Sequence, residues 1–204
     1  MRIIGLTGGI ASGKTSAAHL LERLGAAVID ADQLAREVVQ PGEEALAQIV
    51  ASFGDKIVNP DGTLNRAALG EIVFADPAAR RTLEGITHPA IKQRAEEKLE
   101  RLRAAGTSTA FYVAPLLFEA GITSRVHEVW VVYLDRETQL QRLMARDGLS
   151  REAALSRIAS QMPMEEKKKL GKVVIDNRGS KEELEAQVLK LWREEIADRE
   201  PERE

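Results

Sequence analysis

The 204-residue sequence contains no cysteine. It therefore forms no disulfide bond, and it has no thiolate for a zinc site, an iron–sulfur cluster or a nucleophile. Lack of thiols also fits a reducing compartment. Histidine is scarce as well, since only His19, His88 and His127 are present and they lie far apart in the sequence. This argues against a metal site built from several histidines.

The sequence also lacks an excess charge and a long apolar run. Lys+Arg number 29 and Asp+Glu 32, for a net charge of −3, so no overall basic character indicates a nucleic-acid partner. The longest apolar run, 110–118, contains Pro115 and is far too short to cross a bilayer. The first apolar segment turns into Thr7-Gly8-Gly9 too early for a signal peptide. We therefore expect a soluble, cytoplasmic protein without a membrane or nucleic-acid partner.

The hydrophobic residues, 44 % of the sequence, alternate between patterns typical of strands and of helices. Near-continuous apolar segments at 107–114 and 128–134 are typical of parallel strands that are covered on both faces. The alternation predicts a doubly wound α/β fold with a five-stranded parallel sheet. The predicted strands cover 2–6, 27–30, 107–114, 128–134 and 172–175.

The segment 41–106 differs from the rest because it contains no clear strand. It holds a helical stripe over 45–53, a helix to Phe74 that Asn65 could cap, one opened by Asp76-Pro77, and a long charged one opened by His88-Pro89. This pattern predicts a helical insertion between the second and third strands. The alternative is a set of long crossover helices.

The remaining helices are marked by their ends. The helix 14–24 stops at Gly25, and helices 138–146 and 151–161 are separated by Asp147-Gly148. Ser180 with Glu183 forms a capping-box pattern that opens the last helix. We expect the tail 199–204 to be disordered.

A glycine-rich segment follows the first strand and matches the phosphate-loop pattern G-x-x-x-x-G-K-[ST]. Glycines let backbone N–H groups turn toward a phosphate, and the next helix adds the partial positive charge of its N-terminus. Lys14 is expected to reach the β- and γ-phosphates, and the Thr15 hydroxyl to bind Mg²⁺. The alternative is a glycine-rich turn with an exposed lysine. The pattern predicts a nucleoside-triphosphate site at Gly9, Ala11, Ser12, Gly13, Lys14, Thr15 and Ser16.

Other features favour a small kinase. No N-K-x-D guanine motif is present, although the sequence does not decide whether the protein prefers ATP or GTP. The chain is too short for a motor or a helicase core. Asp30-Ala31-Asp32 ends the second strand, at the edge of a parallel sheet where ligands collect. Asp32 could orient an acceptor hydroxyl or help to hold Mg²⁺. Alternatively, it caps the next helix.

Cationic side chains follow the fourth strand. Arg142 and Arg146 are four residues apart and share a helix face, as do Arg157 and Gln161 on the next helix. A solvated charged face is one explanation. A helical lid that closes over the phosphates and excludes water is the other.

Several further segments occur in an order and at spacings known from one enzyme family. They are Val28–Asp32, His88-Pro89, Pro115–Glu119, Arg142–Arg146, Gln161–Pro163 and Val174–Asn177. With the phosphate loop, they resemble the bacterial dephospho-CoA kinase family from Met1 to about Trp192. The resemblance implies that ATP phosphorylates the ribose 3′-hydroxyl of dephospho-CoA to give CoA and ADP, the last step of coenzyme A biosynthesis.

The resemblance also implies an architecture of three parts. A P-loop nucleotide-binding core would comprise 1–40, 107–137 and 171–204, a helical acceptor-binding (CoA) domain 41–106, and a helical lid 138–170. We expect a monomer or a weak oligomer that binds ATP, Mg²⁺ and dephospho-CoA.

The resemblance assigns roles to individual residues. Asp32 would be the base or orienting group for the hydroxyl, Arg142 and Arg146 would stabilise phosphate charge, and Asn177 would contact adenine. Asp32, Lys14 and Arg142 then form the catalytic set. The expected acceptor contacts are Thr7, Asp32, Arg66, His88, Pro115, Leu116, Leu117, Phe118 and Glu119.

Some of these residues have simpler explanations. His88 could shape a helix start, and the apolar residues 116–118 could belong to the core. Glu119 follows a buried run and needs a partner, such as Mg²⁺-bound water. Gly171-Lys172 stands where the family usually has alanine and aspartate, and Thr15-Ser16 replaces the commoner serine and threonine while keeping both hydroxyls.

Two other functions share part of this pattern. A nucleoside or nucleoside-monophosphate kinase would have the phosphate loop, the acidic pair and the lid, but not the Pro115–Glu119 and Asn177 segments together. An ATP-dependent switch protein would bind ATP and have no small-molecule acceptor.

Overall fold

The computed structural model describes residues 1–197, whose contacts form two compact units. Unit 1 comprises residues 1–29 and the chain from residue 102 onward, and unit 2 comprises residues 30–101. The helices expected to form the lid belong to unit 1, together with the sheet. The three-part division with a separately moving lid therefore stays a prediction. The tail 199–204, expected to be disordered, lies outside the described residues.

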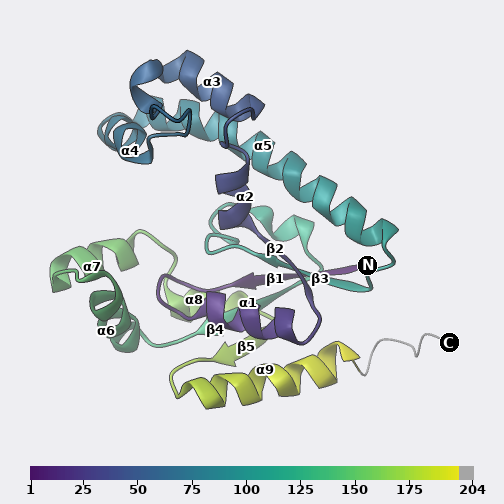
Figure 1. The fold of residues 1–204 in the computed structure, drawn as a ribbon. Helices are drawn as coiled ribbons and strands as arrows, with labels where there is room; N and C mark the ends of the chain where they lie inside the picture. Colours follow the sequence, from purple (N-terminus) through teal and green to yellow (C-terminus); the bar gives the residue numbers. More distant parts are fainter. Residues whose placement is uncertain (198–204) are drawn as a thin grey trace. The chain divides into compact units, whose positions relative to one another are not determined.

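Unit 1 is built on a five-stranded sheet with the order β2-β3-β1-β4-β5 (Figure 1). β1 pairs in parallel with β3 and β4, and β4 pairs in parallel with β5. The predicted α/β fold with a five-stranded parallel sheet is confirmed. The strands are Arg2–Thr7 (β1), Ala27–Asp30 (β2), Thr109–Val113 (β3), Glu128–Tyr133 (β4) and Val173–Asp176 (β5).

Both faces of this sheet are buried, which explains the near-continuous apolar runs. Alternate residues of each strand, among them Phe111 and Trp130, face α1 (Lys14–Arg23) and α9 (Lys181–Glu195). The rings of Phe111 and Trp130 meet edge to face, with centroids 5.3 Å apart. On the other face, Tyr133 donates to Glu165 of α8 (Met164–Leu170). The core facing α1 and α9 contains Ile4, Leu6, Leu20, Leu21, Phe111, Val113, Trp130, Val132, Ile175, Leu184 and Val188.

Three helices follow β4 in the region expected to form the lid. Asp135 caps α6 (Arg136–Asp147) by accepting from the Thr138 N–H, and Gly148 ends that helix with φ 64°. α7 (Arg151–Ala159) packs on α6 around Leu140, Leu143 and Ala154. α8 (Met164–Leu170) was not predicted, because charged residues fill most of it and hide any apolar period.

Unit 2 is helical, as the sequence predicted for this segment. Its elements are α2 (Ala31–Glu37), α3 (Glu44–Phe53), the 3-10 helix η1 (Asp55–Ile57), α4 (Arg66–Ala75) and most of α5 (Pro77–Ala104). A small core of Val38, Val39, Ile49, Ile57 and Leu69 holds them together. Among residues 1–197, no helix has the length and apolar character needed to span a membrane.

One helix start was predicted wrongly from the sequence, and the alternative role of Asp32 as a helix cap is excluded. His88-Pro89 does not open a helix, because Pro89 lies inside the continuous helix α5. Proline has no N–H for the carbonyl of Gly85, one turn earlier, and this carbonyl lies on an exposed residue where water can replace the lost bond. The cap of α2 is Asp30, whose side chain accepts from the Asp32 N–H at 2.8 Å, and not Asp32.

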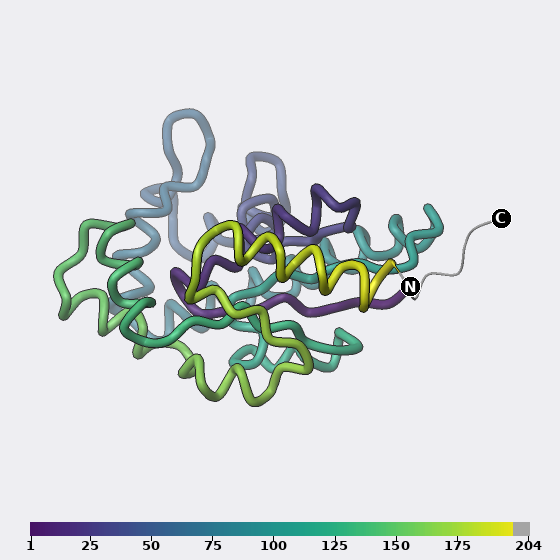
Figure 2. Tube along the Cα trace, turned by 90° about the horizontal axis from the view of Figure 1, so that it is seen from below, coloured from purple at the N-terminus to yellow at the C-terminus, as the bar shows by residue number. Residues whose placement is uncertain are grey.

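The start of β1 lies beside the end of α9, where Arg2 donates to the carbonyl of Glu195 (Figure 2). The carboxylate of Glu128 ties this start of β1 to neighbouring strands. Glu128 accepts from Arg2 at 2.6 Å, from Lys172 at 2.6 Å and from the Trp130 indole at 2.9 Å. Burial is the largest single influence and raises the pKa of Glu128, but the three hydrogen bonds together outweigh it. The pKa falls from an ordinary 4.5 to about 2.

The lowered pKa of Glu128 makes stability depend on pH. Its carboxylate stabilises the fold above the unfolded-state pKa, and this contribution is lost as the pH falls toward about 2. We expect Glu128→Gln to have a lower free energy of unfolding than the wild type at pH 7. The difference should shrink as the pH falls from 4.5 toward 2, as measured by urea unfolding.

Glu185→Gln is the matched control, because Glu185 pairs with Arg23 through side chains that are 53 % and 61 % exposed. Such an exposed pair contributes little, so this variant should differ little from the wild type at any pH. A stability difference for Glu128→Gln that is the same at pH 7 and pH 3 would contradict the role of Glu128.

Candidate active site

The start of α1 presents a positive charge that nothing in the described chain neutralises. Gly13 occupies the N-cap position, so no side chain caps the first N–H groups of the helix. Lys14 is only 8 % exposed, and it forms no ion pair within residues 1–197. The Lys14 ammonium and the free N–H groups at the start of the helix together form a site that suits an anion.

The loop before α1 has an uncommon backbone. Ala11 has φ 59°, a conformation that residues with a β-carbon rarely adopt. Gly13 has φ 86°, and a β-carbon there would collide with the Asn177 amide nitrogen. The Ser12 hydroxyl is buried without a hydrogen-bond partner in the described part of the chain. Strain and an unsatisfied hydroxyl in one short loop are typical of a functional site.

Side chains from distant elements hold the tip of this loop. Gln139 of α6 is 3 % exposed, and its Nε2 donates to the carbonyl of Ile10 at 2.9 Å. The Ile10 N–H donates to Oε1 of Gln161 at 2.8 Å, and the Gly9 N–H donates to the sulfur of Met164 at 3.1 Å. Both backbone groups of Ile10 are therefore satisfied without any nucleotide.

Asn177, which the sequence placed against adenine, holds the other end of the loop. Its Nδ2 donates to the carbonyl of Ser12 at 2.7 Å, and the residue is 6 % exposed. Its own N–H donates to the carbonyl of Tyr133 at 2.8 Å, which fixes it at the end of β5. Contact with adenine stays a prediction, whereas the contact with the loop is present.

The two predicted phosphate-binding arginines have different partners. Arg142 donates to the carbonyl of Gly179 at 3.3 Å, next to the Asn177 segment. Arg146 instead pairs with Asp147 through two bonds of 2.7 and 3.1 Å, and Arg157 reaches the same carboxylate at 3.1 Å. The hydrogen bond from Arg146 lowers the pKa of Asp147. Arg142 is thus directed toward the segment that contains Asn177, while Arg146 is held at the turn between α6 and α7.

The segment after β3 is predicted to contact the acceptor, and its residues are placed differently. The Pro115 carbonyl accepts from the Thr7 hydroxyl at 3.3 Å. Leu117 is fully buried, where its side chain packs against Gly5, whereas Leu116 is 43 % exposed and Phe118 is half-buried. Leu117 is therefore a core residue in this structure, which was the simpler explanation for it.

Glu119 has protein partners. Its Oε1 lies 2.8 Å from the Lys167 ammonium and accepts from the Met162 N–H at 2.9 Å. These two groups meet the expectation that this carboxylate needs a partner, and a contact with Mg²⁺-bound water stays a prediction.

Unit 2 brings together two other predicted acceptor residues. Arg66 and His88 line one pocket of about 290 Å³, whose wall is otherwise mostly apolar. Asp32 is exposed in the first turn of α2, and its carboxylate has no hydrogen bond or ion pair within residues 1–197. The apolar wall comprises Ala35, Val39, Ile49, Leu64, Leu69, Val73, Leu83 and Ile91.

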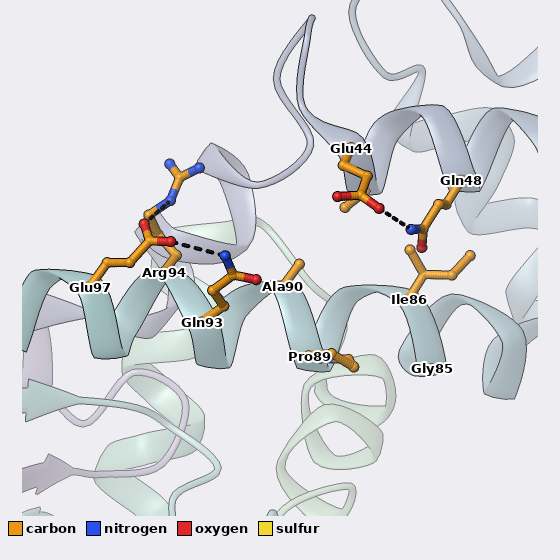
Figure 3. Close-up of a pocket in the computed structure, with 10 residues that line it drawn as sticks. Glu44, Gln48, Gly85, Ile86, Pro89, Ala90, Gln93, Arg94 and Glu97 are labelled. Atoms are coloured by element: carbon orange, nitrogen blue, oxygen red, sulfur yellow. Dashed lines mark hydrogen bonds and ion pairs between the residues drawn. The ribbon is translucent and has the colours of Figure 1, made fainter.

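A second pocket of unit 2, of about 280 Å³, lies between α3 and another face of α5 (Figure 3). It contains none of the predicted site residues. Its polar side chains bond to one another, Gln48 to Glu44 at 2.9 Å and Gln93 to Glu97 at 3.0 Å.

Sequence reasoning missed three residues that contact the site. Gln139 is an amide on the buried face of an amphipathic helix, and that position was its only signal. Met164 looked like an ordinary apolar residue. Lys167 belongs to a run of three lysines, of which the sequence pattern singles out none.

The departure from the family pattern at Gly171-Lys172 has a local explanation. A β-carbon at residue 171 would lie 2.5 Å from Cγ2 of Val131, so alanine does not fit beside this valine. Lys172 pairs with Glu128 at 2.6 Å. Both residues therefore suit their neighbours on β4, and neither touches the phosphate loop.

Comparison with known proteins agrees with this geometry. A family model described as dephospho-CoA kinase matches residues 2–183. A dephospho-CoA kinase from Geobacter sulfurreducens is 62 % identical over 192 residues, which is 94 % of this chain and 98 % of that protein.

Solved structures give the same result. A dephospho-CoA kinase from Campylobacter jejuni superposes with a TM-score of 0.75 at 32 % identity, covering 98 % of this chain and 100 % of that one. A shikimate kinase from Acinetobacter baumannii superposes with a TM-score of 0.52 at 17 % identity over 98 % of this chain and 96 % of that one, which shows the shared fold alone. The chain belongs to the dephospho-CoA kinase family.

Proposed function

We propose that this enzyme transfers the γ-phosphoryl group of ATP to the ribose 3′-hydroxyl of dephospho-CoA, giving CoA and ADP. The observation that supports this most strongly is Lys14, a residue only 8 % exposed at the uncapped start of α1, whose ammonium has no carboxylate partner within residues 1–197. An anionic ligand would balance this charge, and a triphosphate also matches the free N–H groups around it.

Phosphoryl transfer requires positioning and charge stabilisation rather than a covalent intermediate on the protein. The N–H groups at the start of α1 orient the phosphates, and Lys14 stabilises the charge that develops on the transferred group. Mg²⁺ fits this site, because it is generally held by one or two protein oxygens together with phosphates and water. The exposed Thr15 in the first turn of α1 would supply that oxygen, and the ion would neutralise phosphate charge.

Asp32 is proposed as the proton acceptor. Because Asp30 caps α2, the Asp32 carboxylate is left for another role. In the proposed step, the 3′-oxygen attacks the γ-phosphorus, its proton passes to Asp32, and the bond to the ADP oxygen breaks.

The pocket with Arg66 and His88 is proposed as part of the acceptor site. A guanidinium at its rim suits the diphosphate of dephospho-CoA, and the apolar wall suits the pantetheine chain. Both parts of the acceptor would therefore find a matching surface in unit 2.

A product assay tests the function against its alternatives. The protein is incubated with ATP, Mg²⁺ and, separately, dephospho-CoA, nucleosides and nucleoside monophosphates. We expect one CoA per ADP, and product only with dephospho-CoA. Transfer to a nucleoside or its monophosphate would favour the other kinases. Bound ATP with no acceptor product would favour a switch protein.

Asp32→Asn tests the proton acceptor. We expect turnover to fall on the order of a hundredfold or more, because the amide cannot take the proton, while the Kd for ATP changes little. Asp30→Asn is the matched control, since asparagine caps a helix as well as aspartate does, and it should lose much less turnover. Equal turnover in Asp32→Asn and the wild type would leave Asp32 without a role.

Arg66→Ala and His88→Ala test the acceptor pocket. Each should raise the KM for dephospho-CoA by roughly tenfold, through the loss of a charged or polar contact, and leave the KM for ATP unchanged. Gln48→Ala and Gln93→Ala, in the pocket of Figure 3, are controls that should change neither constant. If the four variants had the same effect, the assignment of the pocket would be wrong.

A further inference from the structure

Lys167 of α8 is a lysine whose side chain is fully buried. Its neighbours in the lysine run, Lys168 and Lys169, are exposed. The Lys167 ammonium donates to the Pro115 carbonyl at 2.7 Å and pairs with Glu119 at 2.8 Å. Because an unpaired buried charge is costly, this ammonium keeps both acceptors in place.

Glu119 connects Lys167 to the turn 161–164. The carboxylate oxygen that meets Lys167 also accepts from the Met162 N–H at 2.9 Å. Met162 stands between Gln161 and Met164, whose side chains accept from the Ile10 and Gly9 N–H groups. Three successive contacts thus lead from Lys167 to the tip of the phosphate loop.

Pro115 connects Lys167 to the beginning of the phosphate loop. Its carbonyl accepts both from Lys167 and from the hydroxyl of Thr7, the last residue of β1. The loop follows Thr7 directly. Lys167 therefore acts on the beginning of the loop and on its tip, although the structure shows no direct contact between Lys167 and the loop.

We infer that Lys167 is a positioning residue for the nucleotide site. Through Glu119 and Pro115 it fixes the turn 161–164 and the end of β1, and so holds Gly9 and Ile10 in the conformation that binds a triphosphate. The strained Ala11 beside them is stable only while its surroundings determine it. This inference rests on the proposed binding of ATP at the loop.

Loss of Lys167 is expected to affect binding more than chemistry. If the loop has its binding conformation only a tenth of the time, the Kd for ATP rises about tenfold. Saturating ATP restores that conformation, so kcat is largely kept while the KM for ATP rises.

The test measures the Kd for ATP with Mg²⁺ by calorimetry, then kcat and the KM for ATP, in Lys167→Met, Glu119→Ala and the double variant. Each single variant should raise the Kd and the KM about tenfold, and the double variant no more than the larger single effect, because both act through one path. Glu119→Ala also tests the path if Lys167→Met does not fold, since the Glu119 side chain is 23 % exposed.

Glu128→Gln is the matched control, because it breaks ion pairs of unit 1 that lie outside this path. It should lower stability and leave the Kd for ATP unchanged. If Lys167→Met and Glu119→Ala lower the melting temperature but bind ATP as the wild type does, or lower kcat with an unchanged Kd, the inference is wrong. A wild-type protein that fails to bind ATP would instead overturn the proposed function.

Discussion

The phosphate loop is the constraint on which the rest of unit 1 depends. The N–H groups at the start of α1 and the Lys14 ammonium, which are offered to an anion, make no contact within the described residues that stabilises the loop itself. Contacts with other elements must therefore fix the conformation of the loop. Gln139, Gln161, Met164 and Asn177 supply the hydrogen bonds that define it, and they belong to α6, the turn before α8, α8 itself and the segment after β5.

Sequence patterns predicted the parts of the molecule that are decided locally. The five strands and the phosphate loop follow from short periods and fixed spacings, and the capping box at Ser180 from two residues three apart. Pro89 inside α5 went against such a rule, because the local preference of residue 88 was overridden by a helix continuous on both sides. Local sequence rules predict most of the fold, because most elements are determined by their own residues. These rules fail where a neighbouring element determines the conformation.

The supporting residues of the site could not be predicted in the same way. The carboxylate partner of Lys167 lies 48 positions away and the carbonyl partner of Gln139 lies 129 positions away, so no window of sequence connects these residues with their partners. A buried lysine and an exposed one look alike in a lysine run until the fold is known. Asp30 and Asp32 are close in sequence, but only the structure distinguishes their roles. Asp30 caps α2, and the carboxylate of Asp32 is left available.

The central claim is that the loop is held in its binding shape before any nucleotide arrives. Amide hydrogen exchange of the nucleotide-free wild type tests it most directly, at single residues. The account predicts that the Gly9 and Ile10 N–H groups, bonded to Met164 and Gln161, exchange at least about a hundredfold more slowly than the same amides in an unfolded chain. The uncapped N–H groups of Thr15 and Ser16 should exchange faster than these two. Rapid exchange at Gly9 and Ile10 would contradict the account, because the loop would then acquire its shape only from the ligand.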